Sequence, residues 1–200
     1  MVLLPIAYNG RCLRAKPVLS HVHTRDNFSR SQDEVDYLME LITEKLKQFQ
    51  TDPAIKSERV RVKVIGRRTD LSDEMNREID IVEAMTADHD RFLLNIALSY
   101  GGRAEIIDAV KEVANQVKAG DLNINDIDEA RFAEYLYTQG VPDPDLIIRT
   151  SGEERLSGFL LWQSAYSELY FTDVFWPAFR MIDFWRALRI YQQRERRFGR

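Results

Sequence analysis

Two arginines and several hydroxyl side chains follow directly after a predicted strand near the C-terminus. Arg149 closes the apolar stretch 145–150, and Arg155 and Ser157 come next in a turn-rich segment that contains Gly152. Planar guanidinium groups suit the oxygens of a phosphate or diphosphate, and hydroxyls and loop amides can complete such a cradle. The same arginines could instead pair with neighbouring surface carboxylates, those of Asp145, Glu153 and Glu154. On the residues alone, both interpretations stay open.

A glutamate close to these arginines is a candidate metal ligand. Glu168 lies in an aromatic run between Tyr166 and Phe171. Mg²⁺ prefers carboxylates that it shares with phosphate oxygens, but a lone glutamate in such a run is more often structural. The three histidines lack the spacing of a zinc site: they are His21, His23 and His89.

The composition is that of an ordinary globular domain. The chain has 200 residues, of which 44% are apolar and 30% charged, and this length can bury a substantial core. The net charge of −4 argues against general affinity for nucleic acid, so a phosphorylated ligand needs locally placed arginines. The single cysteine, Cys12, excludes an intrachain disulfide, and no apolar run is as long as a membrane-spanning helix. We expect one cytoplasmic domain over residues 1–200.

Helix-like and strand-like segments alternate from about residue 31 onward. Apolar periodicity predicts helices at 31–49, 71–85, 106–117, 125–139 and 183–197. Alternation or short apolar runs predict strands at 59–65, 92–98 and 145–150. Ser31 with Glu34 three residues later predicts a capping box for the first helix. The pattern indicates an α/β fold with a mostly parallel central sheet flanked by helices, where ligands bind beyond the carboxyl ends of the strands.

Long stretches of the sequence resemble the cis-prenyltransferase family, which includes undecaprenyl diphosphate synthases. The C-terminal signature is PDPDLIIRTSGEERLSGFLLWQSAYSELYFTDVFWP, together with the closing RERRFG. Upstream, RVRVKVIG and LNIALSYGGRAEIIDAV resemble two strands of that family and the helix after them. DNFSRSQDEVDYLM resembles its segment with Asn, an aromatic residue, Arg and Glu at fixed spacing. The resemblance runs from about residue 24 to the end.

The resemblance implies roles for individual residues. Arg149, Arg155 and Ser157 match residues that hold the diphosphate of isopentenyl diphosphate, and Glu168 matches a glutamate that helps to bind Mg²⁺, potentially across a dimer. Asn27 matches a catalytic residue that assists proton removal. The other matching positions are residues that bind substrate in the family: Thr24, Phe28, Arg30, Glu34, Arg197 and Gly199. Arg197 and Gly199 match a tail motif that reaches a substrate diphosphate in the partner subunit. Glu34 could equally serve only the capping box.

The N-terminal segment departs from the family pattern. The family's first strand ends in an Asp-Gly-Asn loop whose aspartate holds magnesium, and a long helix and a second strand follow. Residues 1–23 show no such loop, only Tyr8-Asn9-Gly10-Arg11 without the aspartate. Gly158 also stands where the family commonly has Asn. We therefore expect a cis-prenyltransferase-like domain that lacks its first strand–loop–helix unit, through a truncated or frame-shifted start.

The resemblance implies a transferase that condenses isopentenyl diphosphate onto an allylic prenyl diphosphate with cis double bonds, using Mg²⁺. The expected assembly is a homodimer, or a heterodimer with a catalytic relative, and the lipid product could bring it to a membrane surface. A non-catalytic accessory subunit, an inactive relative and a generic nucleotide-binding module are the alternatives. The last is disfavoured because no glycine-rich phosphate fingerprint follows a predicted strand.

Overall fold

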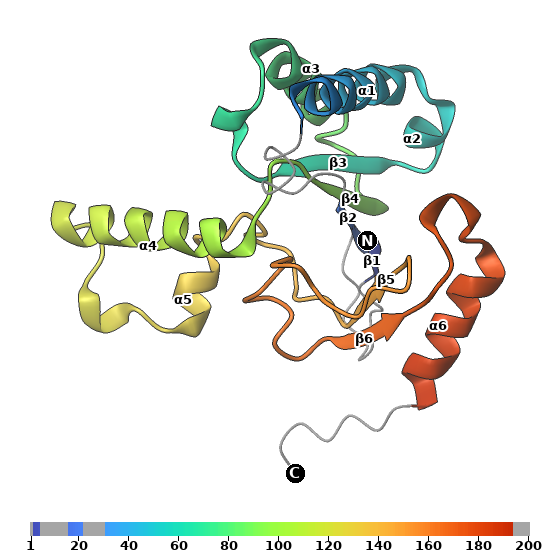
Figure 1. Cartoon of the computed structure of the whole chain (residues 1–200). Coiled ribbons are helices and arrows are strands. Elements are labelled where there is room, and N and C mark those ends of the chain that lie inside the picture. The colour runs from blue at the N-terminus through green and yellow to red at the C-terminus, as the bar shows by residue number, and fades with distance from the viewer. Residues whose placement is uncertain (1, 5–15, 22–30, 194–200) are drawn as a thin grey trace.

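The computed structural model describes the backbone of residues 2–4 and 16–21 and the whole of residues 31–193. Six strands form one sheet in the order β3-β4-β2-β1-β5-β6 (Figure 1). The strands are β1 (Val2–Leu4), β2 (Lys16–His21), β3 (Val60–Ile65), β4 (Phe92–Ala97), β5 (Leu146–Arg149) and β6 (Glu168–Phe171). The α-helices are α1 (Gln32–Thr51), α2 (Pro53–Ser57), α3 (Asp73–Met85), α4 (Gly102–Ala119), α5 (Glu129–Ala133) and α6 (Met181–Gln193).

The sheet is mostly parallel, as the sequence predicts. β2, β3, β4, β5 and β6 run in one direction, because β1 is antiparallel to both of its neighbours, β2 and β5. The carboxyl ends of β3, β4 and β2 lie at one level, where Ile65 pairs with Ala97 and Ala97 with His21. Val2 pairs with both Ser20 and Ile148, which places the end of β5 at the same edge. This edge collects the segments in which ligands of parallel sheets bind.

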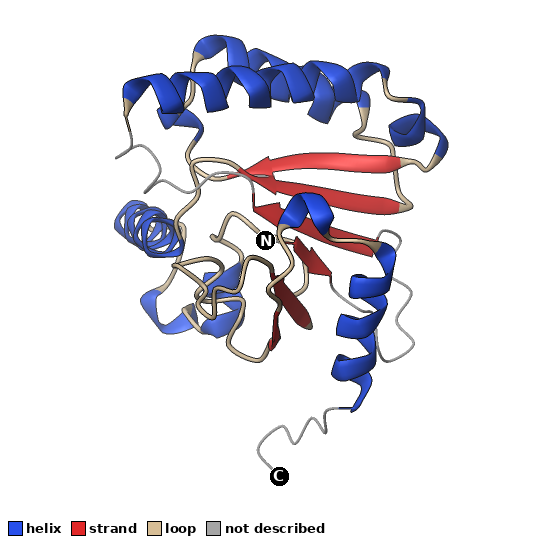
Figure 2. Ribbon diagram, turned by 45° about the vertical axis from the view of Figure 1, so that its right-hand side comes forward, coloured by secondary structure: helices blue, strands red, loops and turns tan. Residues whose placement is uncertain are grey.

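Helices cover one face of the sheet. Val64 of β3 and Ile96 of β4 point to this face and pack with Leu46 of α1 and Ile79 of α3. Ile148 of β5 lies level with Ile96 and packs under α6 instead. Figure 2 shows α1 and α3 as one layer over β3 and β4, with α6 near the other end of the sheet. In the part of the chain that the structure describes, no helix combines the length and apolarity needed to cross a bilayer.

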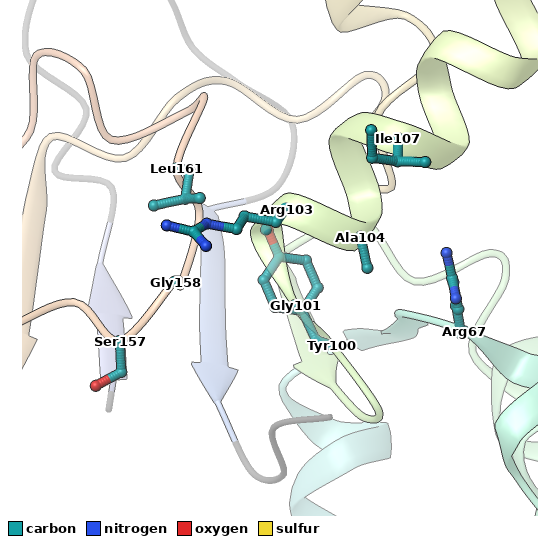
Figure 3. A pocket seen from close by; sticks show the side chains of 10 residues that line it. Arg67, Tyr100, Gly101, Arg103, Ala104, Ile107, Ser157, Gly158 and Leu161 are labelled. Carbon is teal, nitrogen blue, oxygen red and sulfur yellow. The ribbon is translucent and has the colours of Figure 1, made fainter. Parts of the chain in front are cut away.

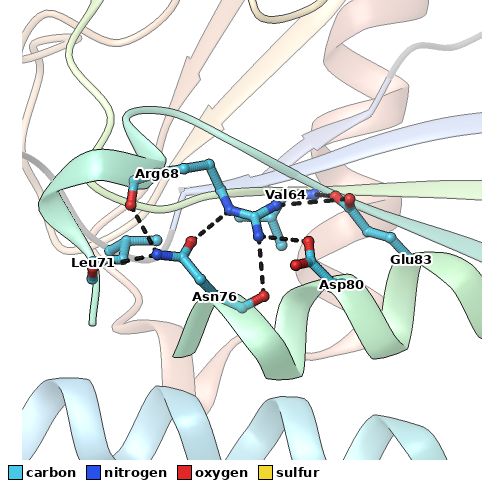
Figure 4. Close-up of polar contacts among 6 residues, drawn as sticks. All are labelled: Val64, Arg68, Leu71, Asn76, Asp80 and Glu83. Atoms are coloured by element: carbon cyan, nitrogen blue, oxygen red, sulfur yellow. Dashed lines mark hydrogen bonds and ion pairs between the residues drawn. The ribbon is translucent and has the colours of Figure 1, made fainter. Parts of the chain in front are cut away.

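The exposed edge of β3 is tied to α3 by side chains. The Thr86 hydroxyl accepts from the Val62 amide at 3.0 Å, and the Glu83 carboxylate accepts from the Val64 amide at 2.7 Å. The Arg68 guanidinium, just past the strand, donates to Asn76 and to Asp80 of α3, each at 2.7 Å (Figure 4). Edge strands expose unpaired amides, and these acceptors satisfy two of them. The network also fixes the path of the chain as it leaves β3.

The second face is covered by a chain segment without long helices. Ile65, Ala97 and Ile147 point to this face and pack with Phe159 and Leu160, which lie in the turns between β5 and β6. α4 starts at the carboxyl edge and extends away from the sheet, and α5 lies beside it (Figure 1). The residues that follow the end of β5 therefore take part in the hydrophobic core.

Several local expectations need correction. The segment 1–23 was expected to lack the family's first strand–loop–helix unit, and no strand was predicted at β1, β2 or β6, all of which the structure contains. The helix predicted at 125–139 spans only α5, residues 129–133, because the chain turns beyond it. Ser31 occupies the N-cap of α1, but its side chain makes no capping hydrogen bond, so the predicted capping box is wrong. The closing helix is α6, and residues 194–197 of its predicted range lie outside the described residues.

Candidate functional site

Arg149, Arg155 and Ser157 lie together at the carboxyl end of β5, and we call them the cradle. Arg149 is the last residue of β5, and its guanidinium donates to the Ser157 hydroxyl at 3.0 Å and to the carbonyl oxygen of Arg155. Arg155 is largely exposed and forms an ion pair with Glu153. The sequence interpretations were an anion cradle or surface pairing. The structure brings the three residues together and gives Arg155 a carboxylate partner as well.

The electrostatics of the cradle favour an anion. The pKa of Arg149 lies below its usual range because burial disfavours its charged form and Arg155 adds a second positive charge nearby. Glu153 opposes this shift in part. A guanidinium stays protonated near neutral pH despite such a shift. The cradle therefore holds two positive charges that a bound diphosphate would stabilise.

The backbone after β5 adopts conformations that most residues avoid. Ser151, Ser157 and Leu160 have φ of 73°, 48° and 46°, in the left-handed region that costs a non-glycine residue about 1 kcal/mol or more. Gly152 and Gly158 have φ of 69° and 74°. Three strained non-glycine residues within ten positions indicate a segment whose shape is imposed by its contacts. Such clusters are typical of ligand-binding loops.

A cavity of about 610 Å³ adjoins the cradle on the side of α4. Ser157, Gly158 and Leu161 form one wall, and Gly101 with Arg103 at the start of α4 forms another (Figure 3). Arg67, from the end of β3, also lines the cavity but pairs with Asp108 at 2.6 Å. The sequence predicted no role in ligand binding for Arg67 or Arg103, yet both line the cavity.

Glu168 lies away from the cradle within the same subunit. It pairs with Leu146 at the beginning of β5, whereas Arg149 pairs with Phe171. Three residues along the strand separate the two positions, about 10 Å. Among residues 31–193, no cluster of three His, Cys, Asp or Glu side chains could hold a metal ion. Glu168 therefore belongs to no such cluster in the described part of one subunit.

Most of the other predicted site residues lie outside the described part of the chain. These are Thr24, Asn27, Phe28, Arg30, Arg197 and Gly199. Glu34 is described and lies exposed in the first turn of α1. β2 ends at His21, opposite Ala97 of β4, so the segment from Thr24 to Arg30 follows a strand that ends at the same edge as β5.

Comparison with known proteins decides the family. Residues 15–199 match the family model described as "Putative undecaprenyl diphosphate synthase". The chain belongs to the undecaprenyl diphosphate synthase family. This match starts inside segment 1–23, for which the sequence alone suggested no resemblance. The prenyltransferase resemblance of the sequence motifs is thereby confirmed.

Relatives in this family are transferases from archaea and bacteria. A tritrans,polycis-undecaprenyl-diphosphate synthase (geranylgeranyl-diphosphate specific) from Thermoplasma volcanium is 48% identical over 188 residues, which are 94% of this chain and 73% of the relative. An isoprenyl transferase from Thermus thermophilus is 53% identical over 189 residues, covering 92% of this chain and 72% of the relative.

Solved structures of the family show the same fold. Lavandulyl diphosphate synthase from Lavandula x intermedia, crystallised with dimethylallyl diphosphate, superposes with a TM-score of 0.86 at 34% identity. That superposition covers 91% of this chain and 78% of the other. A probable undecaprenyl diphosphate synthase from Campylobacter jejuni gives a TM-score of 0.81 at 32% identity, covering 92% and 83%. The predicted α/β fold class is confirmed.

Proposed function

We propose that this chain is a cis-prenyltransferase that condenses isopentenyl diphosphate onto an allylic prenyl diphosphate. The observation that carries the proposal is the cradle: Arg149 and Arg155 hold two positive charges beside the Ser157 hydroxyl at the carboxyl edge of the sheet. Its residues coincide with those that the family resemblance assigns to the diphosphate of isopentenyl diphosphate. The family membership supports the same reaction class.

In the proposed reaction the cradle positions the nucleophile. The allylic C–O bond breaks and its electron pair leaves with the diphosphate, while the double bond of isopentenyl diphosphate attacks the allylic carbon. Loss of a proton from isopentenyl diphosphate then restores a double bond, with Asn27 as the expected assistant. Arg149 and Arg155 contribute by fixing the diphosphate of isopentenyl diphosphate, since orientation of two reactants removes much of the entropic barrier.

Magnesium is expected from the family, and Glu168 is the described residue that the resemblance assigns to it. A divalent ion would screen the charge of the departing allylic diphosphate. Because Glu168 lies at the opposite end of β5 from the cradle, we propose that it contributes to a site completed by other parts of the dimer. No step of the cradle's action depends on that site.

We propose a homodimer in which a second copy covers the apolar side of α4. Ile107 and Val110 are 52% and 48% exposed on this helix. A neighbouring groove of about 470 Å³ is almost wholly apolar and includes Val117, Ile124 and Phe132. Ile107 also lines the cavity beside Ser157. A second copy bound here would therefore lie next to the cradle, as expected for a tail that binds substrate across the interface.

The proposal is tested by incorporation of labelled isopentenyl diphosphate by the purified chain with Mg²⁺. Geranylgeranyl diphosphate is the first primer to use, since the names of the archaeal relatives specify it. We expect extended polyprenyl products, and their loss in Arg149→Ala/Arg155→Ala. Arg131→Ala, which removes an exposed arginine of α5 paired with Glu134, should leave incorporation unchanged. A folded chain that binds isopentenyl diphosphate but makes no product would support the accessory-subunit alternative.

A further inference from the structure

The segment that carries Arg155 and Ser157 is held by short-range turns and by contacts with other elements. Residues 150–167, between β5 and β6, contain turns but no helix or strand. Its base is fixed by two backbone bonds, from Ser151 to Val174 at 3.0 Å and from Gly152 to Thr172 at 2.9 Å. Because local backbone conformation is unfavourable at Ser157, the position of its hydroxyl must depend on contacts further along the segment.

One such contact is made by the backbone of α4. The Gly102 amide donates to the Gly158 carbonyl at 2.8 Å. A Cβ atom at position 102 would lie 2.5 Å from that carbonyl oxygen and 2.9 Å from a side-chain atom of Leu161. Approach this close is possible only for glycine. The first residue of α4 is thus pressed against the residue that follows Ser157.

A second contact is a buried side-chain hub. Gln163 is 3% exposed, and its amide nitrogen donates to both carboxylate oxygens of Glu105 at 3.2 Å and to the Thr138 hydroxyl at 2.9 Å. Glu105, in the first turn of α4 and 1% exposed, also accepts from the Tyr100 hydroxyl and from the Tyr137 amide at 2.9 Å. One carboxylate therefore joins the end of β4, the residues after α5 and the segment of the cradle.

Three residues of the hub lie outside the cavity, although Tyr100, whose hydroxyl donates to Glu105, does line it. None of Glu105, Gln163 and Thr138 lines the cavity beside Ser157. Burial raises the pKa of Glu105, and the hydrogen bonds from Tyr100 and Gln163 oppose that shift. The hydrogen bonds of a buried polar network help to fix the arrangement of the elements that it joins, and each group left unsatisfied adds a cost. Here the Gln163 amide oxygen is buried without a hydrogen-bond partner. The bonds from the Gln163 amide nitrogen tie the far end of the segment to Glu105 of α4 and to Thr138.

We infer that Gln163 and Gly102 are positioning residues for the cradle: they fix where Ser157 and Arg155 stand relative to Arg149. The inference rests on the proposed function, because positioning matters only if the cradle binds a diphosphate. Arg149 belongs to the rigid strand, whereas the other two cradle residues belong to the segment. Their mutual geometry is set by how the segment docks on α4.

The test is Gln163→Met, which keeps the length of the side chain and removes its donors. Misplacement of binding groups by about 1 Å can cost up to about a hundredfold. We expect the KM and the calorimetric Kd for isopentenyl diphosphate to rise about tenfold or more, with kcat changed by less than about threefold. The exchange Glu105→Gln/Gln163→Glu restores a carboxylate–amide pair and should recover most of the binding.

Thr86→Val is the matched control for a loss of stability. Thr86 is 3% exposed and hydrogen-bonds to Val62 and Val82 in the other half of the sheet. We expect a similar fall in melting temperature with unchanged KM. Equal rises of KM in Gln163→Met and Thr86→Val, or no rise in a folded Gln163→Met, would overturn the positioning role alone. Absence of binding by the wild-type chain would instead remove the proposed function and this inference with it.

Discussion

Replacement of Arg149 by alanine tests the cradle most sharply. The guanidinium group donates to the Ser157 hydroxyl at 3.0 Å and lies beside Arg155, so alanine removes one of two charges that would face a diphosphate. At about 4 Å, with an effective dielectric constant near 20, a charge pair contributes about 4 kcal/mol. Because Arg149 is only half-buried, screening by solvent should reduce this to about 2 kcal/mol. That corresponds to about a thirtyfold loss of affinity.

The assay is steady-state incorporation of labelled isopentenyl diphosphate at saturating primer. We expect the KM for isopentenyl diphosphate to rise about thirtyfold in Arg149→Ala. Arg149→Lys should fall between wild type and alanine, because lysine keeps the charge but loses the planar fork. Arg131→Ala again serves as the control for an exposed, paired arginine. A KM within about twofold of wild type for a folded Arg149→Ala would refute the reasoning.

Three further outcomes follow from the same geometry. Gly102→Ala should raise the KM for isopentenyl diphosphate, because the new Cβ would collide with the Gly158 carbonyl of the segment that carries Ser157. Gly120→Ala is its control: Gly120 has a φ of 84° and open space around it, so this change should lower only the melting temperature. The Arg67 guanidinium holds the pKa of Asp108 below its usual range, so this carboxylate stabilises the fold above about pH 4 and loses that contribution as pH falls through its lowered pKa. Asp108→Asn should therefore reduce the free energy of unfolding at pH 7 by about 1–2 kcal/mol, and this effect should shrink as the pH falls through the lowered pKa of Asp108, as chemical denaturation can check. Ile107→Glu should shift sedimentation from dimer to monomer without unfolding the chain, and an unchanged dimer would exclude the α4 side as the interface.

Elements with strong local signals could be predicted from the sequence. β3 alternates apolar and polar residues up to Gly66, and α3 has an apolar stripe beginning after Ser72, whose side chain accepts from the Met75 amide at 3.2 Å. Gly66 has a φ of 124°, and a Cβ there would lie 1.9 Å from the Leu98 carbonyl oxygen. A glycine at the end of a predicted strand can be recognised from the sequence as the point where the strand ends, because the backbone at such a position permits no other residue.

Elements that depend on distant partners could not be predicted. β6 consists of four half-buried residues, Glu168–Phe171, whose strand character comes from pairing with β5. The helix predicted at 125–139 ends at Ala133, and the chain continues in turns. Further on, the Tyr137 amide donates to the Glu105 carboxylate, which lies 32 residues away. β1 and β2 likewise owe their place to pairing across the sheet, since their sequence shows no clear period.

The same difference between local signals and distant partners separates the residues of the candidate site that could be predicted from those that could not. Cradle residues could be named from the sequence because arginines and a serine cluster within nine residues after a strand. The hub could not, because Gln163 and Glu105 are 58 residues apart. Both lie in stretches that resemble the family, but nothing in those stretches marks the two residues as partners. The assignment of Glu168 to a metal stays a prediction, and its distance from the cradle could not be predicted because it depends on strand register.

Titration of isopentenyl diphosphate into the wild-type chain and into Arg149→Ala/Arg155→Ala, followed by calorimetry, tests the central claim most directly. The account predicts one site per wild-type chain and loss of measurable binding in the double variant, with Arg131→Ala unaffected. Equal binding by the wild-type chain and the double variant, or no binding by a folded wild-type chain, would contradict it.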